Sequence, residues 1–156
     1  METTLTAMVQ YQVAEIELVY KSKVKASQRP QVLHSKDVYE IFKQSWDENK
    51  IDFVEQFKIM LLNRSNRVLA IYEVSTGGIT GTVADPRIIF TAALKLNSVA
   101  IALCHNHPSG ELKPSRQDEA LTEKIRNAGL FLDIKVIDHV IISGESYYSF
   151  ADEGLL

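Results

Sequence analysis

The six residues Val99–Cys104 constrain the fold most, because they form the longest unbroken apolar run in the chain. A run of this length suits a strand covered on both faces, as the central strand of a layered α/β sheet is. It is far shorter than the roughly 20 apolar residues of a membrane-spanning helix. Residues Met1–Gln10 also lack the basic start and the apolar stretch of a signal peptide. We therefore expect a cytoplasmic protein with no membrane-spanning segment.

The size and composition of the chain are those of one domain. It has 156 residues, of which 46% are hydrophobic, enough to bury a core without disulfides. Its single cysteine is compatible with a reducing compartment. The net charge of −3 argues against a broad phosphate-binding surface, since non-specific nucleic-acid binding depends on Lys and Arg. A local basic group, Lys21, Lys23, Lys25 and Arg29, is interpreted as the solvated face of an edge strand, with a binding patch as the alternative.

The hydrophobic pattern alternates between strands and helices, and no repeat or linker divides the chain. Strands are expected over Val13–Val24, Phe53–Leu62, Val68–Val74, Ser98–Cys104 and Phe131–Ser143, with short extended pieces at Ile79–Val83 and Tyr147–Phe150. Helices are expected to begin at the caps Ser35, Asp85 and Ser115; the second should reach about Leu96 and the third should end at Gly129. This order predicts a three-layer α/β fold with helices flanking a mixed β-sheet.

Two histidines follow the expected central strand directly. Because alternate residues of a strand point to one face, His105 and His107 should project together at its end, where Pro108 stops the strand. Asp118 lies in the first turn of the helix that Ser115 opens, where the helix dipole favours an ionised carboxylate. Three protein ligands with a fourth position left to water are typical of a catalytic zinc site. The sequence therefore predicts one Zn²⁺ bound by His105, His107 and Asp118.

The same residues also have interpretations that need no metal. Ser115 and Asp118 form a variant capping box, and histidines at a strand end can be hydrogen-bonded polar residues without further function. A zinc deaminase is excluded, because its signature needs Pro-Cys-x-x-Cys and this chain has one cysteine, Cys104, which should point into the core. A zinc-activated water also needs a general base. Glu55 and Glu73 both share a strand face with apolar residues, and the pattern alone does not separate them.

The motif as a whole resembles a known one. The spacing His-x-His-Pro, six residues, Ser, two residues, Asp is matched without a gap by His105, His107, Pro108, Ser115 and Asp118. It resembles the JAMM (MPN-plus) metalloprotease motif, and the surrounding sequence resembles the RadC branch of that superfamily. The resemblance covers roughly residues 51–156. Outside the motif it rests on Glu55-Gln56-Phe57, Leu62-Asn63, Asp85-Pro86-Arg87, Asp138-His139-Val140-Ile141 and Tyr148-Ser149-Phe150.

This resemblance implies a cytidine deaminase-like three-layer fold in a single domain over residues 1–156. It implies zinc-dependent hydrolysis of an amide or isopeptide bond in a protein or peptide substrate, with the three zinc ligands predicted above. Glu55 matches the catalytic glutamate of the family and would act as the general base. Ser115 matches the motif serine and would hold the water or stabilise the oxyanion.

Other functions stay open at this point. RadC relatives often carry a DNA-repair label, so a nucleic-acid binding or processing module without peptidase activity is the alternative. Many of them also have an N-terminal helix-hairpin-helix region, and Met1–Lys50 lacks its paired short helices. A zinc ion kept only for stability is disfavoured, because structural zinc usually has four protein ligands. Asp138-His139 matches a pattern of the family but indicates no mechanism, and for His139 a buried structural role is favoured.

Overall fold

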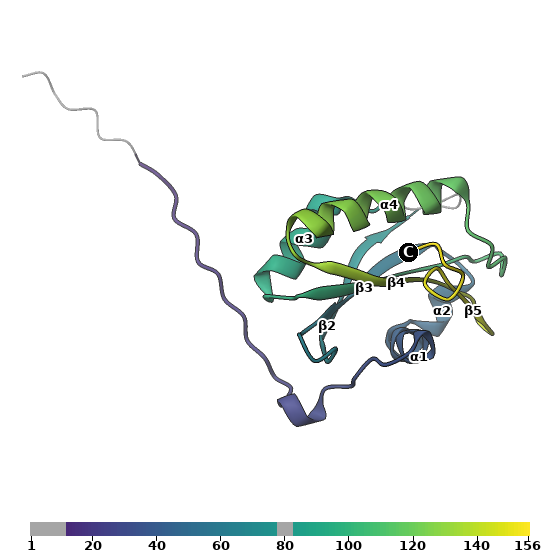
Figure 1. Ribbon diagram of the computed structural model, residues 1–156, viewed down its shortest axis with the longest axis horizontal. Helices are drawn as coiled ribbons and strands as arrows, with labels where there is room; N and C mark the ends of the chain where they lie inside the picture. The colour runs from purple at the N-terminus through teal and green to yellow at the C-terminus, as the bar shows by residue number, and fades with distance from the viewer. Residues whose placement is uncertain (1–11, 78–82) are drawn as a thin grey trace, which may run out of the picture.

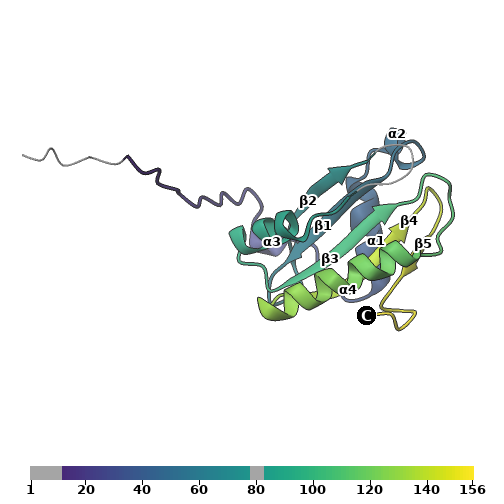
Figure 2. The same ribbon diagram turned by 90° about the horizontal axis from the view of Figure 1, so that it is seen from above.

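A computed structural model describes residues 12–77 and 83–156 of the chain. Within those ranges, five strands form one sheet in the order β2-β1-β3-β4-β5. The elements are α1 (Ser35–Ser45), α2 (Glu48–Ile51), β1 (Gln56–Leu62), β2 (Val68–Thr76), α3 (Pro86–Lys95), β3 (Ala100–Asn106), α4 (Arg116–Phe131), β4 (Lys135–Ile142) and β5 (Tyr147–Ser149). Because β3 pairs antiparallel with β1 and parallel with β4, the sheet is mixed. Helix α1 covers one face, and α3 and α4 cover the other (Figures 1 and 2), which confirms the three-layer α/β prediction.

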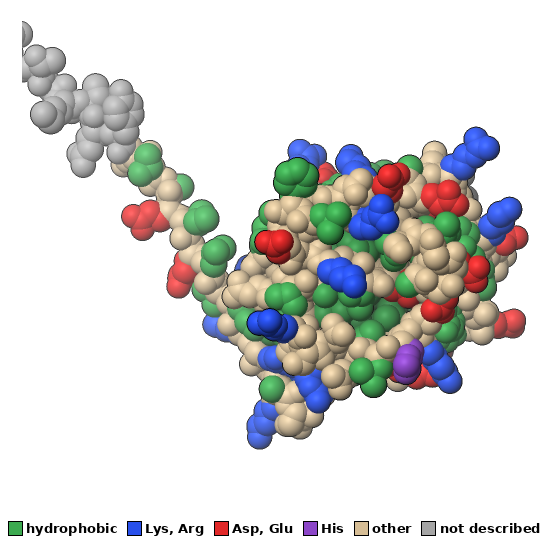
Figure 3. Space-filling model, in the orientation of Figure 1, with side chains coloured by type: hydrophobic (Ala, Val, Ile, Leu, Met, Phe, Trp, Pro, Cys, Tyr) green, Lys and Arg blue, Asp and Glu red, His purple; other side chains and the backbone are tan. Residues whose placement is uncertain are grey.

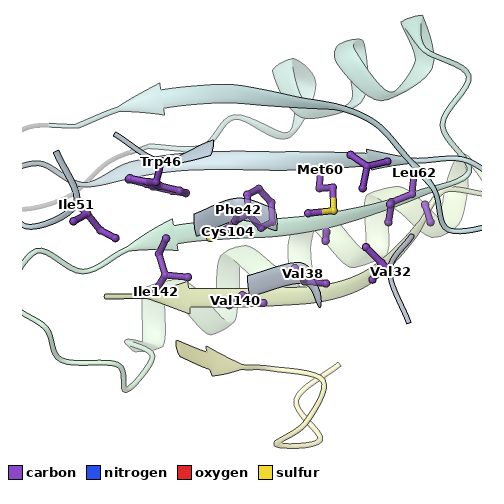
Figure 4. Close-up of a cluster of buried hydrophobic side chains, with 13 residues drawn as sticks. Val32, Val38, Phe42, Trp46, Ile51, Met60, Leu62, Cys104, Val140 and Ile142 are labelled. Carbon is purple, nitrogen blue, oxygen red and sulfur yellow. The ribbon is translucent and has the colours of Figure 1, made fainter. Parts of the chain in front are cut away.

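The predicted central strand is indeed central, since every residue of β3 is buried. Its side chains alternate between two cores. The core beneath α1, part of which Figure 4 shows, contains Phe42, Trp46, Met60, Leu62, Ala102, Cys104 and Val140. The core beneath α3 and α4 contains Phe57, Ile59, Leu61, Ile89, Phe90, Ile101, Leu103 and Ile125. Burial of this strand on both faces explains its unbroken apolar sequence.

The strand predicted over Val13–Val24 does not form. Residues 12–25 have no regular secondary structure and lead away from the body of the domain (Figures 1 and 3). Their apolar side chains are open to solvent, with Val13 84% and Ile16 89% exposed. Alternation alone does not stabilise a strand, because the backbone groups need a ladder partner and no described strand pairs with this segment. The lysines of this segment are therefore not on the face of an edge strand.

Several predicted boundaries shift because polar caps override the apolar pattern. His34, not Ser35, is the N-cap of α1, and the Asp37 carboxylate accepts hydrogen bonds of 2.8 Å from the backbone N–H groups of Leu33 and His34. The turn that follows the short helix α2 includes Phe53 and Val54, whose N–H groups donate to the carbonyl oxygen of Lys50, so β1 begins at Gln56. Asp85 caps α3, as predicted. Its carboxylate accepts a hydrogen bond from the backbone N–H of Arg87.

Gly129 was expected to end the helix that Ser115 opens, but it does not. Helix α4 continues to Phe131, and the left-handed residue that follows is Asp133, with φ of 54°. Strand β4 therefore begins at Lys135 and not at Phe131. Most of the extended piece expected at Ile79–Val83 lies outside the described residues. None of the helices in the described ranges has the length and apolar character needed to cross a bilayer.

Candidate metal centre

The three predicted ligands come together where β3 ends and α4 begins. His105 is the penultimate residue of β3, His107 follows the strand, and Asp118 lies in the first turn of α4. One ligand atom from each side chain lies within 4.8 Å of the others, so the three groups could hold one metal ion. The distance from His105 Nε2 to Asp118 Oδ1 is 3.3 Å, and that from His107 Nε2 to Asp118 Oδ2 is 3.6 Å.

Hydrogen bonding indicates which nitrogen of His107 is free to bind a metal. Its Nδ1 lies 2.5 Å from the backbone carbonyl oxygen of Glu111. A carbonyl only accepts, so Nδ1 carries the hydrogen and, in a neutral ring, Nε2 keeps a lone pair. That Nε2 lies 2.9 Å from Nε2 of His105. Two imidazole nitrogens and a carboxylate converging in this way form a donor set that suits a divalent transition metal such as zinc.

The electrostatics of the three ligands also favour a cation. Burial raises the pKa of Asp118, but His105 and His107, which donate to the carboxylate when Nε2 carries a proton, outweigh it and hold that pKa well below its usual value. The hydrogen bond with Asp118 in turn raises the pKa of His107. In the metal-free protein the cluster therefore attracts a proton, and a metal ion would compete with that proton for the same lone pairs.

The capping interpretation of Ser115 and Asp118 is correct, and it is compatible with metal binding. The backbone N–H of Ser115 donates to Asp118 Oδ2 at 2.7 Å, and the N–H of Asp118 donates to Ser115 Oγ at 3.1 Å. This exchange fixes the carboxylate at the start of α4, with Oδ1 turned toward His105. The cap thus orients a ligand and stabilises the helix with the same two side chains.

The two candidate bases lie on opposite faces of the sheet. Glu55 is half-buried immediately before β1. Strand β1 pairs Phe57 with His105 in antiparallel register, and continuing that register two residues further brings Glu55 opposite His107. The charge of Glu55 accordingly contributes to the raised pKa of His107.

Glu73 has a different neighbourhood. It pairs across the sheet with Lys58, whose amine reaches the carbonyl oxygen of Ser45 at the end of α1. Paired residues point to the same face, so Glu73 faces the α1 layer and not the metal centre. The geometry thus separates two acids that the sequence pattern alone did not.

The sequence analysis missed one residue that shapes the site from the far side of the sheet. Asn106, between the two histidines, points to the opposite face and is fully buried. Its side-chain amide donates to the carbonyl oxygens of Ile51 at 2.7 Å and Val54 at 2.9 Å, in the segment just before Glu55. Strand alternation could have indicated this orientation of Asn106, because the residue between two histidines on one face must point to the other face.

His139 was assigned a structural role by its place in a buried strand, but it contacts a ligand directly. Its Nε2 lies 2.8 Å from Nδ1 of His105, and its Nδ1 lies 2.6 Å from Oγ1 of Thr122. Burial lowers the pKa of His139 well below its ordinary value, so the ring is neutral. Nothing in the sequence indicated Thr122, which lies one helical turn beyond Asp118.

Asp138, the other residue of this pair, has a structural role that the sequence did not indicate. The side chain accepts hydrogen bonds from Ser149 Oγ at 2.7 Å and from the backbone N–H groups of His139 and Ala151. These bonds fasten the C-terminal turn to β4. Burial raises the pKa of the Asp138 carboxyl above its usual value.

Comparison with known proteins shows the family of the chain. A family model described as "RadC-like JAB domain" matches residues 32–155. Similar relatives are UPF0758 proteins of Flavobacterium johnsoniae (48% identity, 65% of this chain and 44% of the relative), Porphyromonas gingivalis (43%, 65% and 45%) and Trichlorobacter lovleyi (37%, 76% and 50%). The chain thus spans about half the length of these relatives or less. With the family model matching most of its length, the chain belongs to the RadC-like JAB domain family.

Proposed function

We propose that this protein is a zinc-dependent hydrolase that cleaves an amide or isopeptide bond in a protein or peptide substrate. The observation that carries the proposal is the convergence of His105, His107 and Asp118 on one point, with three ligands rather than the four of a structural zinc site. A zinc ion bound there would act as a Lewis acid on a water molecule and on the scissile carbonyl.

The remaining steps fall to side chains around the metal centre. Glu55, next to His107 in register, would accept a proton from the attacking water and later donate it to the leaving amine. Ser115 is exposed, and its Oγ already accepts from the N–H of Asp118. Its hydroxyl hydrogen is therefore available to donate to an oxyanion on the substrate.

Because the substrate is unidentified, the test of this proposal is a panel of fluorogenic peptide-linked and isopeptide-linked substrates, assayed with the zinc-loaded protein. Where cleavage is found, Glu55→Gln should lower kcat by about 100-fold or more while zinc remains bound. Glu73→Gln is the matched control, because Glu73 faces the opposite layer, and it should retain wild-type activity. Full activity in Glu55→Gln, or no cleavage of any substrate by a zinc-loaded protein, would contradict the proposal.

A further inference from the structure

Two buried side chains, His139 and Thr122, connect one candidate metal ligand to the backbone of another. His105 Nδ1 lies 2.8 Å from His139 Nε2, His139 Nδ1 lies 2.6 Å from Thr122 Oγ1, and Thr122 Oγ1 donates to the carbonyl oxygen of Asp118 at 2.6 Å. His105, His139 and Thr122 are at most 2% exposed. With so little exposure, solvent water does not offer these atoms alternative partners.

The hydrogens in this chain of contacts can be assigned from one end to the other. Thr122 has a single hydroxyl hydrogen, which it donates to the carbonyl of Asp118. At the next contact the hydroxyl oxygen must therefore accept, so Nδ1 of His139 carries the hydrogen. Nε2 of the neutral His139 ring is then an acceptor, and it receives the hydrogen on Nδ1 of His105. This leaves a lone pair on Nε2 of His105, the atom that faces His107 and Asp118.

We propose that Thr122 and His139 are positioning residues that hold His105 in the tautomer with its hydrogen on Nδ1, so that Nε2 is ready to bind the metal. The inference deepens the proposed function and rests on it in one respect, namely that the centre binds zinc. Groups that hydrogen-bond to the outer nitrogen of a metal-binding histidine are known to fix its tautomer and orientation. Here that group is itself a histidine, whose own tautomer is set by a threonine.

Ring packing keeps both imidazoles in the required orientation. The ring of Phe57 stacks on His105 with centroids 5.9 Å apart and planes at 7°. Phe150 stacks on His139 with centroids 4.6 Å apart and planes at 14°. A ring flip would have to break these contacts as well as the hydrogen bonds.

The opposite tautomer would put hydrogens on Nε2 of both His105 and His139. Thr122 Oγ1 would then face a bare nitrogen on His139, unless its hydroxyl turned away from the carbonyl of Asp118. The hydrogen on Nε2 of His105 would also point into the centre, where it would block the metal.

The first test is a direct observation of the tautomers in the metal-free wild-type protein. Two-bond ¹H–¹⁵N spectra of protein labelled with ¹⁵N-histidine, recorded with a chelator present, distinguish protonated from bare ring nitrogens. The expected result is a hydrogen on Nδ1 and a bare Nε2 in His139, with Nδ1 protonated in His105. A hydrogen on Nε2 of His139 would overturn the proposal, whatever the affinity of the protein for zinc.

The second test compares two substitutions of Thr122 by competition titration of Zn²⁺ against a chromogenic chelator. Thr122→Val keeps the shape of the side chain but removes the oxygen, so zinc affinity should fall by about 10-fold or more. Thr122→Ser keeps the oxygen and should bind zinc nearly as tightly as wild type. Circular dichroism and thermal unfolding of both variants identify any loss that is due to misfolding.

The outcomes separate this inference from the proposed function. If wild type binds zinc and a folded Thr122→Val binds it equally tightly, the positioning role is wrong and the hydrolase proposal is untouched. If wild type binds no zinc, the hydrolase proposal is wrong. The spectra of the metal-free protein still decide which tautomer His139 and Thr122 impose.

Discussion

Asn106 Oδ1 accepts a hydrogen bond of 2.7 Å from the backbone N–H of Gln56, the residue that follows Glu55. The amide nitrogen of the same side chain binds the carbonyl oxygens of Ile51 and Val54. One buried side chain in the histidine-bearing strand therefore fixes the backbone on both sides of the proposed general base. The position of Glu55 relative to the metal centre therefore depends on Asn106, whose side chain points to the opposite face of the sheet.

Replacing Asn106 should damage the protein in a way that its burial explains. Asn106→Leu would leave the N–H of Gln56 and two carbonyl groups without these partners, so the free energy of unfolding should fall by about 3 kcal/mol. Urea unfolding of the variant measures this loss. The matched control is Asn127→Leu in α4, an exposed position where the change should stay within about 0.5 kcal/mol. Equal stability of the two variants would show that the Asn106 contacts contribute little.

A substitution at Gly129 distinguishes helix propensity from close packing. Propensity alone predicts that alanine in the interior of α4 stabilises the protein by about 1 kcal/mol. A Cβ at Gly129, however, would lie 2.3 Å from the backbone oxygen of Ile134, so part of the chain would have to move. We expect Gly129→Ala to lower the free energy of unfolding by about 2 kcal/mol in denaturant titrations.

Gly144→Ala provides the control for this prediction. At Gly144 an added Cβ would meet the Asp52 carboxylate no closer than 3.6 Å, which is an ordinary contact. The substitution should leave stability nearly unchanged. If Gly129→Ala proved more stable than wild type, the close approach of α4 to the start of β4 would be disproved.

The sequence predicted the layered fold and the convergence of the three candidate ligands because both depend on strong local signals. The unbroken run Val99–Cys104 indicated a strand buried on both faces, and β3 is such a strand. The ligands follow from strand alternation at His105 and His107 and from the cap at Ser115, which places Asp118 in the first turn of α4. Each of these features is determined by residues close together in the chain.

The features that were missed depend on distant parts of the chain. The pairing of β3 with β4 shifts register between Ile101 and Ala102, so that Val136 and His139 face the same layer although they are three positions apart. No alternation pattern reveals such a shift. Gly129 resembled a helix C-cap, but its lack of a side chain is required by Ile134, which returns beside it after the turn. Val13–Val24 alternates, but none of the strands within residues 12–77 and 83–156 pairs with it.

Lys58 should make the stability of the protein depend on pH in the alkaline range. Its side chain is buried beneath α1, where Nζ donates to the carbonyl of Ser45 at 3.1 Å and lies 4.3 Å from the ring centroid of Trp46. Desolvation is the main cause that lowers the pKa of Lys58 below its ordinary value of 10.5. Below the lowered pKa, the folded protein bears the cost of burying a charged amine.

As the pH rises from the folded-state pKa toward 10.5, the folded protein releases this proton before the unfolded chain does, and the cost disappears. Lys58→Met has no such proton to release. The difference in unfolding free energy, variant minus wild type, should therefore decrease as the pH rises through this range. Urea titrations at several pH values measure it, and a difference that did not change with pH would show that Lys58 titrates alike in both states.

If His105, His107 and Asp118 bind one metal ion, elemental analysis should find it without any knowledge of the substrate. Wild type, His107→Ala, Asp118→Ala and the neighbouring control Glu119→Ala should be purified without added metal, then supplied with zinc, dialysed and measured per folded chain. We expect one zinc ion in wild type and in Glu119→Ala, and little or none in the two ligand variants. A folded wild-type protein that retains no zinc after it is supplied, or ligand variants that retain as much as wild type, would contradict it.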